Sequence, residues 1–308
     1  MIVATAPVRK ARFVDVAPDD DFWRRLHRLA DQAYPGIRDE VLRALREIAP
    51  RASRAELLRL VTGQQVEGAT AALQELWTLQ AEQWAEGELT QRLTRLAVDA
   101  AEATPGVTIN APRFNVQDPE ALQTIQRRIG DRIVAISDTT RESVRGIVQR
   151  AFESGTPLTQ QMDEIAATVG LTPRQAESVA RFREGLVEAG TKPSEQTRLV
   201  QQRVDALKRQ RAEAIARTES IDAASSGQQA RWEQSARDGF LDVQVARRHW
   251  VITPGDRLCP VCAAIPGMNP EGVRLREPFQ LPVGVVFLSP AHVQCRCAVS
   301  LTTGDDFL

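Results

Sequence analysis

The sequence is poor in aromatic residues, lysine, cysteine and histidine, and these shortages limit the classes of protein that it can encode. Aromatic residues make up 5% of the 308 residues, while alanine and leucine supply much of the apolar share, a composition that favours helices. Only Lys10, Lys192 and Lys208 are lysines, and the other basic residues are arginines. The formal net charge of −1 excludes a bulk cationic field that would attract the chain to nucleic acid or to an anionic membrane.

A long hydrophobic run is also missing. A membrane-spanning helix needs about 18 or more consecutive apolar residues, and no such run occurs. Residues 1–18 lack the apolar segment of a secretory signal peptide. We therefore expect a soluble product made in the cytoplasm, with no membrane partner and with its thiols kept reduced.

Hydrophobic periodicity predicts a mainly helical body. Apolar residues recur three or four positions apart from Asp21 onward, and we expect this helix to break at Tyr34-Pro35-Gly36 and to resume over 38–48. Trp77 and Trp84 lie one heptad apart on the apolar stripe of the helical pattern that follows. We expect them to be core residues rather than anchors for a partner chain.

Strong start and stop signals divide the rest of the helical region. Thr104-Pro105-Gly106 opens a linker, after which Asp118-Pro119 combines an N-cap residue with proline at the first helical position. Thr172-Pro173 repeats this signal, and the helix that it starts should end near Gly190. The last long helix is expected over 194–236. These signals describe antiparallel helices with short connections.

The apolar period changes from three or four to two after Gly239, which predicts strands. We expect strands around Val243 and Val245 and over 249–252, and further strands over 279–281 and 285–288. The predicted fold class is mainly α: an elongated helical body with a small C-terminal α+β region that is β-rich and zinc-ribbon-like. The predicted regions are an N-terminal arm with helices (1–103), a linker (104–117), a helical core (118–236) and a cysteine-knuckle region (237–308).

The four cysteines and one of the three histidines lie in two short knots. The first knot is Cys259-Pro260-Val261-Cys262, and the second contains His292, Cys295 and Cys297 in an H-x2-C-x-C pattern. Structural zinc takes four nitrogen or sulfur ligands in a tetrahedron, so five candidate ligands compete for four positions. Cys259, Cys262 and Cys295 are favoured, and either His292 or Cys297 is the fourth. The alternatives are two disulfides or four buried thiols, but a reducing cytoplasm favours zinc as a structural cofactor.

The sequence predicts no catalytic residues and no binding site for an organic cofactor. A catalytic zinc keeps one position open and has a carboxylate nearby, and Asp256 is the only acidic residue close to the first knot. His27 and His249 fit no pattern of base and nucleophile. A zinc-dependent hydrolase is therefore the least favoured alternative. The dense charge over 198–217 is typical of a solvated helix face rather than of a nucleic-acid track.

Four sequence strings occur together in a recognisable order. They are Phe114-Asn115-Val116, Ile215-Ala216-Arg217-Thr218-Glu219, the first knot with its leading Asp256-Arg257-Leu258, and His292-Val293-Gln294-Cys295-Arg296-Cys297. The ordered set resembles the phage Mu protein F-like family of minor head proteins, also called phage head morphogenesis proteins, over about residues 114–303. That family usually has proline directly after the histidine, where this chain has Val293.

The resemblance implies a non-enzymatic role in virion assembly. Members of the family are low-copy head proteins at the portal vertex or in the capsid interior of tailed bacteriophages. The implied partners are other head proteins, namely the portal and the major capsid protein, and the implied location is the virion head. The alternative is a DNA-contacting module that aids genome packaging or ejection, using arginines of 198–217 and Arg296 on the packaged DNA.

Overall fold

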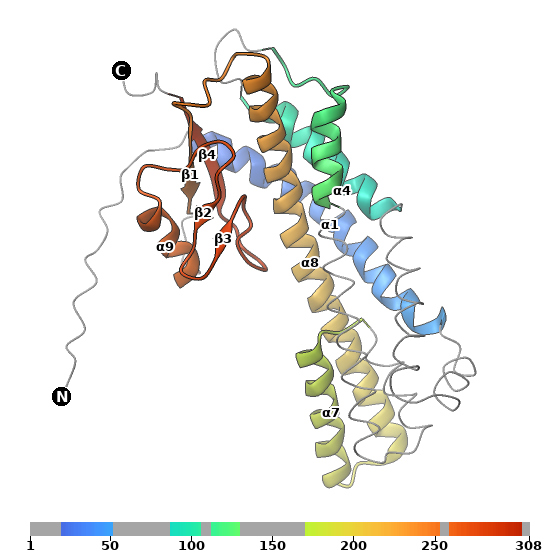
Figure 1. The fold of residues 1–308 in the computed structure, drawn as a ribbon. Coiled ribbons are helices and arrows are strands. Elements are labelled where there is room, and N and C mark those ends of the chain that lie inside the picture. Colours follow the sequence, from blue (N-terminus) through green and yellow to red (C-terminus); the bar gives the residue numbers. More distant parts are fainter. Residues whose placement is uncertain (1–19, 52–86, 106–111, 130–169, 253–258, 304–308) are drawn as a thin grey trace, which may run out of the picture.

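The computed structural model describes residues 20–51, 87–105, 112–129, 170–252 and 259–303. Helix α8 (Pro193–Arg237, 45 residues) is the longest helix in these ranges and forms the axis of an elongated helical body (Figure 1). At 1.5 Å per residue it extends roughly 70 Å. Helices α1 (Asp20–Arg51) and α4 (Glu88–Ala103) pack against it, and α7 (Pro173–Glu188) runs beside its first half. The predicted mainly helical class is confirmed.

The helix starts follow the sequence signals closely. The Thr172 side chain accepts a hydrogen bond from the Gln175 amide, and the Gln175 side chain bonds back to the Thr172 amide, which forms a capping box. Asp118 Oδ1 accepts from the amides of Glu120 at 3.0 Å and of Ala121 at 3.4 Å, so it caps the helical residues 119–129. The predicted starts at 118, 172 and 194 are therefore confirmed to within one residue.

The predicted break at Tyr34-Pro35-Gly36 is wrong, because α1 continues through it. Pro35 is exposed, so its ring lies on the solvent side of the helix. The apolar stripe continues on the inner side through Ile37, Val41 and Leu45, which are at most 1% exposed. Burial of this stripe against α4 and α8 outweighs the hydrogen bond that a proline removes from a helix.

One hydrophobic core joins the elements of the helical body. It is built from small and medium side chains of α1, α4, residues 114–129 and α8. Phe114 is 6% exposed in this core, and the neighbouring Asn115 amide donates to Gln234 Oε1 of α8 at 3.0 Å. The Phe114-Asn115 string therefore docks against α8.

The C-terminal lobe, which we define as residues 247–252 and 259–303, lies beside the second half of α8 (Figure 1). Its first sheet pairs β1 (Arg247–Val251) antiparallel with β4 (Ala298–Thr302), with His249 opposite Ser300. Its second sheet pairs β2 (Phe279–Gln280) with β3 (Val285–Val286). Helix α9 (Pro260–Met268) completes the lobe.

The lobe differs from the sequence prediction in three ways. Residues 243–245 form a turn instead of a strand, because Asp242 Oδ1 accepts from the Gln244 amide and its carbonyl accepts from the Ala246 amide. Strand β4 and helix α9 were not predicted. Since the first knot opens a helix rather than a β-turn, the zinc-ribbon comparison holds only loosely.

Some predictions fall on residues that the structure does not describe. Trp77, Trp84 and Asp256 lie outside the described ranges. The boundaries of the four regions also remain predictions. None of the described helices combines the length and the apolar character that a membrane crossing requires.

Candidate metal centre

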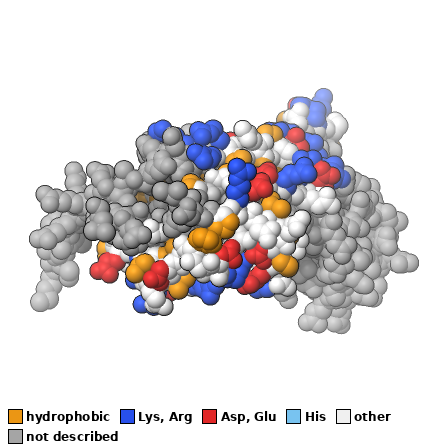
Figure 2. Space-filling view, turned by 90° about the horizontal axis from the view of Figure 1, so that it is seen from above, with side chains coloured by type: hydrophobic (Ala, Val, Ile, Leu, Met, Phe, Trp, Pro, Cys, Tyr) orange, Lys and Arg blue, Asp and Glu red, His pale blue; other side chains and the backbone are white. Residues whose placement is uncertain are grey.

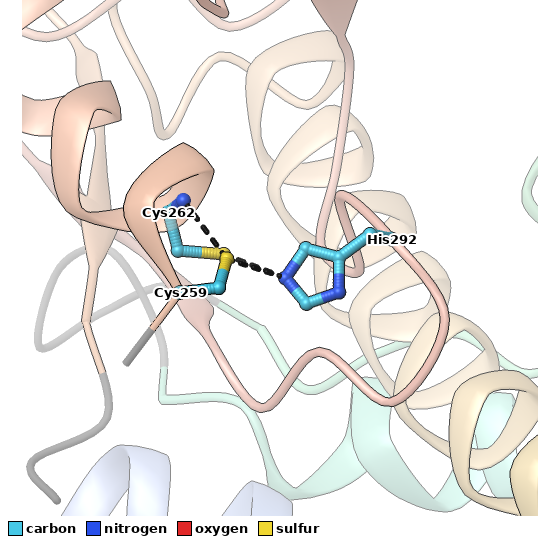
Figure 3. A group of neighbouring side chains, drawn as sticks. All are labelled: Cys259, Cys262 and His292. Carbon is cyan, nitrogen blue, oxygen red and sulfur yellow. Dashed lines mark hydrogen bonds between the residues drawn. The ribbon is translucent and has the colours of Figure 1, made fainter. Parts of the chain in front are cut away.

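The first knot is placed by the start of α9. Cys259 is the N-cap residue of this helix, and its Sγ accepts a hydrogen bond from the Cys262 amide at 3.3 Å. Pro260 follows at the first helical position, where its missing N–H costs nothing. A helix start therefore holds the two thiols of a C-x2-C pair on the same side (Figure 3).

The second knot is a tight turn that brings His292 to the first knot. The Cys295 amide donates to the His292 carbonyl at 3.0 Å and closes this turn. His292 Nε2 lies 3.0 Å from Cys259 Sγ and 3.1 Å from Cys262 Sγ (Figure 3). His292 Nδ1 lies 2.9 Å from the Val293 carbonyl, an arrangement in which Nδ1–H donates and Nε2 is free to bind a metal.

The remaining cysteines lie deeper on the other side of Cys262. Cys295 Sγ is 3.7 Å from Cys262 Sγ, and the Cys262, Cys295 and Cys297 sulfurs lie within 4.8 Å of one another. The ligand atoms of Cys259, Cys262 and His292 also lie within 4.8 Å of one another, so Cys262 belongs to both groups. All four cysteines are free thiols. The structure thus brings all five predicted ligands together.

The spacing of these donors fits a tetrahedral metal site. Zinc–sulfur bonds of about 2.3 Å and a zinc–nitrogen bond of about 2.0 Å require edges of roughly 3.8 Å between sulfurs and roughly 3.5 Å between sulfur and nitrogen. The Cys262–Cys295 separation of 3.7 Å matches the first value, and the two His292 separations of 3.0 and 3.1 Å are somewhat shorter than the second. Two thiol pairs and an imidazole are also the donors that zinc prefers.

The cysteine thiols are joined by hydrogen bonds, and these bonds shift their pKa values in opposite directions. Hydrogen bonds from the Cys262 and Cys297 thiols lower the pKa of Cys295, whereas the bond with Cys295 raises the pKa of Cys262. Burial raises the pKa of Cys259, but hydrogen bonds from Cys262 outweigh it and leave that pKa below its ordinary value. The pKa is thus lowered at Cys295 and Cys259, and a lowered pKa favours the thiolate form that binds metal.

Helix α8 contacts the second knot directly through Thr218. The Thr218 hydroxyl accepts a hydrogen bond from the Gln294 amide at 2.9 Å, in the middle of the His292–Cys295 turn. The Ile215–Glu219 string therefore reaches the C-terminal lobe through its threonine. The neighbouring Arg217 instead stacks over the Tyr34 ring of α1, 5.5 Å from its centroid.

Sequence reasoning missed the residues that fix the lobe to α8. Gln228 Nε2 donates to the Val299 carbonyl at 2.8 Å, and Gln229 Nε2 donates to the Leu275 carbonyl at 3.0 Å. Gln229 Oε1 accepts from Arg248 Nη1 at 3.3 Å. Glutamines within a helical pattern carry no sequence signal for such contacts, so only the fold reveals them.

Arg248 is the central residue of the lobe and is 0% exposed. Its guanidinium donates to the carbonyls of Phe287 at 2.8 Å, Arg274 at 3.3 Å and Glu277. It lies 4.3 Å from the Phe287 ring centroid and 5.3 Å from that of Phe279. Burial lowers the pKa of Arg248 to about 10, which leaves it charged at neutral pH.

Four of the five arginines of 198–217 make intramolecular contacts in the structure, Arg217 among them. Arg211 is 5% exposed and donates to the Gly170 carbonyl at 2.6 Å. Arg198 pairs with Glu195, and Arg203 reaches Ser178. On the upper end of the molecule, which Figure 2 shows, basic and acidic side chains are interspersed. These observations give no support to the alternative of a DNA track.

The fold and the cluster together define a class: a mainly helical protein whose small C-terminal lobe carries a Cys/His cluster that could hold a metal ion. Residues 183–300 match the family model described as phage Mu protein F like protein, which confirms the resemblance for this part of the chain. The matched segment contains the end of α7 from residue 183 onward, all of α8, and every ligand candidate. Searches of curated proteins and of solved structures found no significant match.

The match covers less than half of the chain and shows a similarity to phage Mu protein F-like proteins over this segment. It begins at residue 183, later than the Phe114 string with which the sequence resemblance begins. The helices α1 and α4 lie outside it, although they share a core with α8.

Proposed function

We propose that this chain is a minor head protein of a tailed bacteriophage, acting in head morphogenesis at the portal vertex or in the capsid interior. Its role is structural rather than catalytic. The proposal is supported by the family match over 183–300 and by the way the matched segment is built. In this segment, hydrogen bonds from Gln228 and Gln229 attach the compact lobe to the long helix α8.

We propose further that a structural zinc ion ties the lobe together. Cys259, Cys262, His292 and Cys295 would hold it, because the His292 ring lies within 3.1 Å of two sulfurs and Cys295 lies 3.7 Å from Cys262. Cys297 would remain outside the tetrahedron as a buried thiol, with its carbonyl accepting from the Ser289 hydroxyl. When bound, zinc supplies a cross-link between α9 and the turn before β4.

The single observation that carries this proposal is the meeting of the two knots. Residues 263–291 separate them in the sequence, yet their donor atoms lie within hydrogen-bond distance. The lobe has a modest apolar core, and four filled protein ligands would add stability without an open position for chemistry.

Metal analysis of the purified chain and its Cys259→Ser/Cys262→Ser double variant tests the proposal. We expect about one zinc per wild-type chain and none in the double variant. Limited proteolysis should then cut the lobe of the variant rapidly while the helical body stays intact. Metal-free wild-type protein, or a variant with an unchanged digestion pattern, would contradict the zinc cross-link.

The assembly role has a separate test. Head particles produced with the double variant should contain less of this chain than wild-type particles, because a loosened lobe would no longer fit its neighbours. A Val283→Ser variant serves as the control for surface changes: Val283 is 90% exposed and lies away from the knots in the sequence. Equal incorporation of all three chains would argue against an assembly role for the lobe.

A further inference from the structure

We propose that Thr218 is a positioning residue for the metal centre, holding the turn that presents His292 and Cys295 to the ion. This inference rests on the proposed zinc site. It assigns to α8 a part in metal binding, although α8 carries none of the candidate ligands.

The Thr218 hydroxyl is fixed in the orientation that this task requires. Thr218 is 3% exposed, and its hydroxyl donates to the Ala214 carbonyl one helical turn earlier, at 2.7 Å. A hydroxyl has one proton and two lone pairs, so this donation leaves Oγ1 free to act as an acceptor. The Gln294 amide supplies the proton at 2.9 Å.

The turn that receives this hydrogen bond has a backbone conformation that needs support. Gln294 has φ 62°, in the left-handed region that residues other than glycine rarely adopt. It lies between the two ligand positions, two residues after His292 and directly before Cys295, and the Cys295 amide donates to the His292 carbonyl at 3.0 Å. A change at Gln294 would therefore move both ligands. Thr218 gives the Gln294 amide a partner only when the turn has this shape.

The support comes from a rigid part of the molecule. Residues 218–232 of α8 are all buried, so the position of Thr218 is fixed by packing on several sides. Cys259 and Cys262, in contrast, are held by α9 within the lobe. Thr218 therefore fixes His292 and Cys295 relative to the helical body, and zinc would connect these two ligands to the pair on α9.

Preorganisation of this kind strengthens binding because the turn does not have to be ordered when the ion arrives. Partners that orient metal ligands typically contribute about 10-fold to 100-fold to metal affinity. We expect Thr218→Val, which keeps the shape of the side chain and removes the hydroxyl, to weaken zinc binding by about this factor. Thr218→Ser keeps the hydroxyl and should bind zinc like the wild type.

The chain offers a matched control in Ser220. Its hydroxyl donates to the Ala216 carbonyl at 2.7 Å, the same contact that Thr218 makes with Ala214, and Ser220 is 1% exposed. Ser220→Ala thus removes the same kind of buried helix contact, at a side chain that makes no hydrogen bond to the turn within the described residues. We expect its zinc affinity to equal that of the wild type.

The experiment is a competition for zinc ion alone between each full-length chain and a chromophoric chelator. Far-ultraviolet circular dichroism verifies the fold of each variant. Cobalt absorption then reports whether the same tetrahedral thiolate set binds the metal. Weaker zinc binding by Thr218→Val alone, with an unchanged cobalt spectrum, is the expected result. Equal affinities of wild type and Thr218→Val overturn the inference, as does an equal loss in Ser220→Ala.

A measurement on the unaltered chain covers the case in which Thr218→Val fails to fold. The Gln294 amide should exchange with deuterium more slowly than a free amide even in metal-free protein, because its partner is Thr218 and not the ion. Free exchange in that state overturns the inference. Failure of the zinc site itself is a different result, since wild-type protein would then bind no zinc.

Discussion

Helix α4 approaches α8 closely at Gly227 of α8, and a methyl group placed there should push α4 away. A Cβ at this position would lie 1.7 Å from the Ala97 carbonyl oxygen and 2.7 Å from its carbon. Ordinary contact begins at 3.4 Å, so the first distance is 1.7 Å too short. The obstructing atoms are backbone, which cannot rotate away as a side chain can.

The Gly227→Ala variant therefore combines two opposing effects. Alanine in place of glycine within a helix stabilises by about 1 kcal/mol. Overpacking a core costs about 1–3 kcal/mol, and the upper end applies because a whole helix has to shift. The net result is a loss of roughly 2 kcal/mol in the free energy of unfolding, equivalent to about 3 °C in Tm for a chain of 308 residues.

Gly185→Ala in α7 is the matched control. A Cβ there would meet nothing within 4 Å, so only the gain in helix propensity remains. Urea unfolding of wild type and both variants, followed by far-ultraviolet circular dichroism, should place Gly227→Ala below the wild type and Gly185→Ala at or above it. A Gly227→Ala variant as stable as Gly185→Ala would refute the close packing of α4 on α8.

Two further predictions concern buried polar groups. Arg248→Met removes the side chain that donates to three carbonyls, and it should lower the free energy of unfolding by about 3 kcal/mol or more. Limited proteolysis should then cut the lobe faster than the helical body, and equal cleavage rates would contradict this prediction. For Asp118, burial raises the pKa, but the amides of Ala121 and Glu120 and the nearby Arg237 outweigh it and leave the pKa below its usual value. A carboxyl group whose pKa is lower in the folded than in the unfolded chain stabilises the fold above its unfolded pKa of about 3.9, and this stabilisation is lost as the pH falls. The difference in unfolding free energy between wild type and Asp118→Asn should therefore shrink below about pH 4. A difference that stays constant with pH would count against this contribution.

The sequence alone was sufficient for features that depend on near neighbours along the chain. The N-caps at Asp118 and Thr172 were predicted because capping needs only a side chain and amides two or three residues away. The ligand candidates were found in the same way, since zinc ligands come in short pairs whose spacing is visible in the sequence. The length of α8 also followed from its uninterrupted helical pattern.

Features that depend on distant partners were decided only by the tertiary structure. Pro35 predicts a break, but burial of α1 against two other helices keeps the helix continuous. Arg248 and Gln229 resemble ordinary polar residues until the fold surrounds them with carbonyls. The same holds for Thr218, whose partner Gln294 lies 76 positions away, because a hydrogen bond across such a distance in the chain leaves no local pattern. The sequence therefore determined which donors are present, and long-range packing decided how they meet.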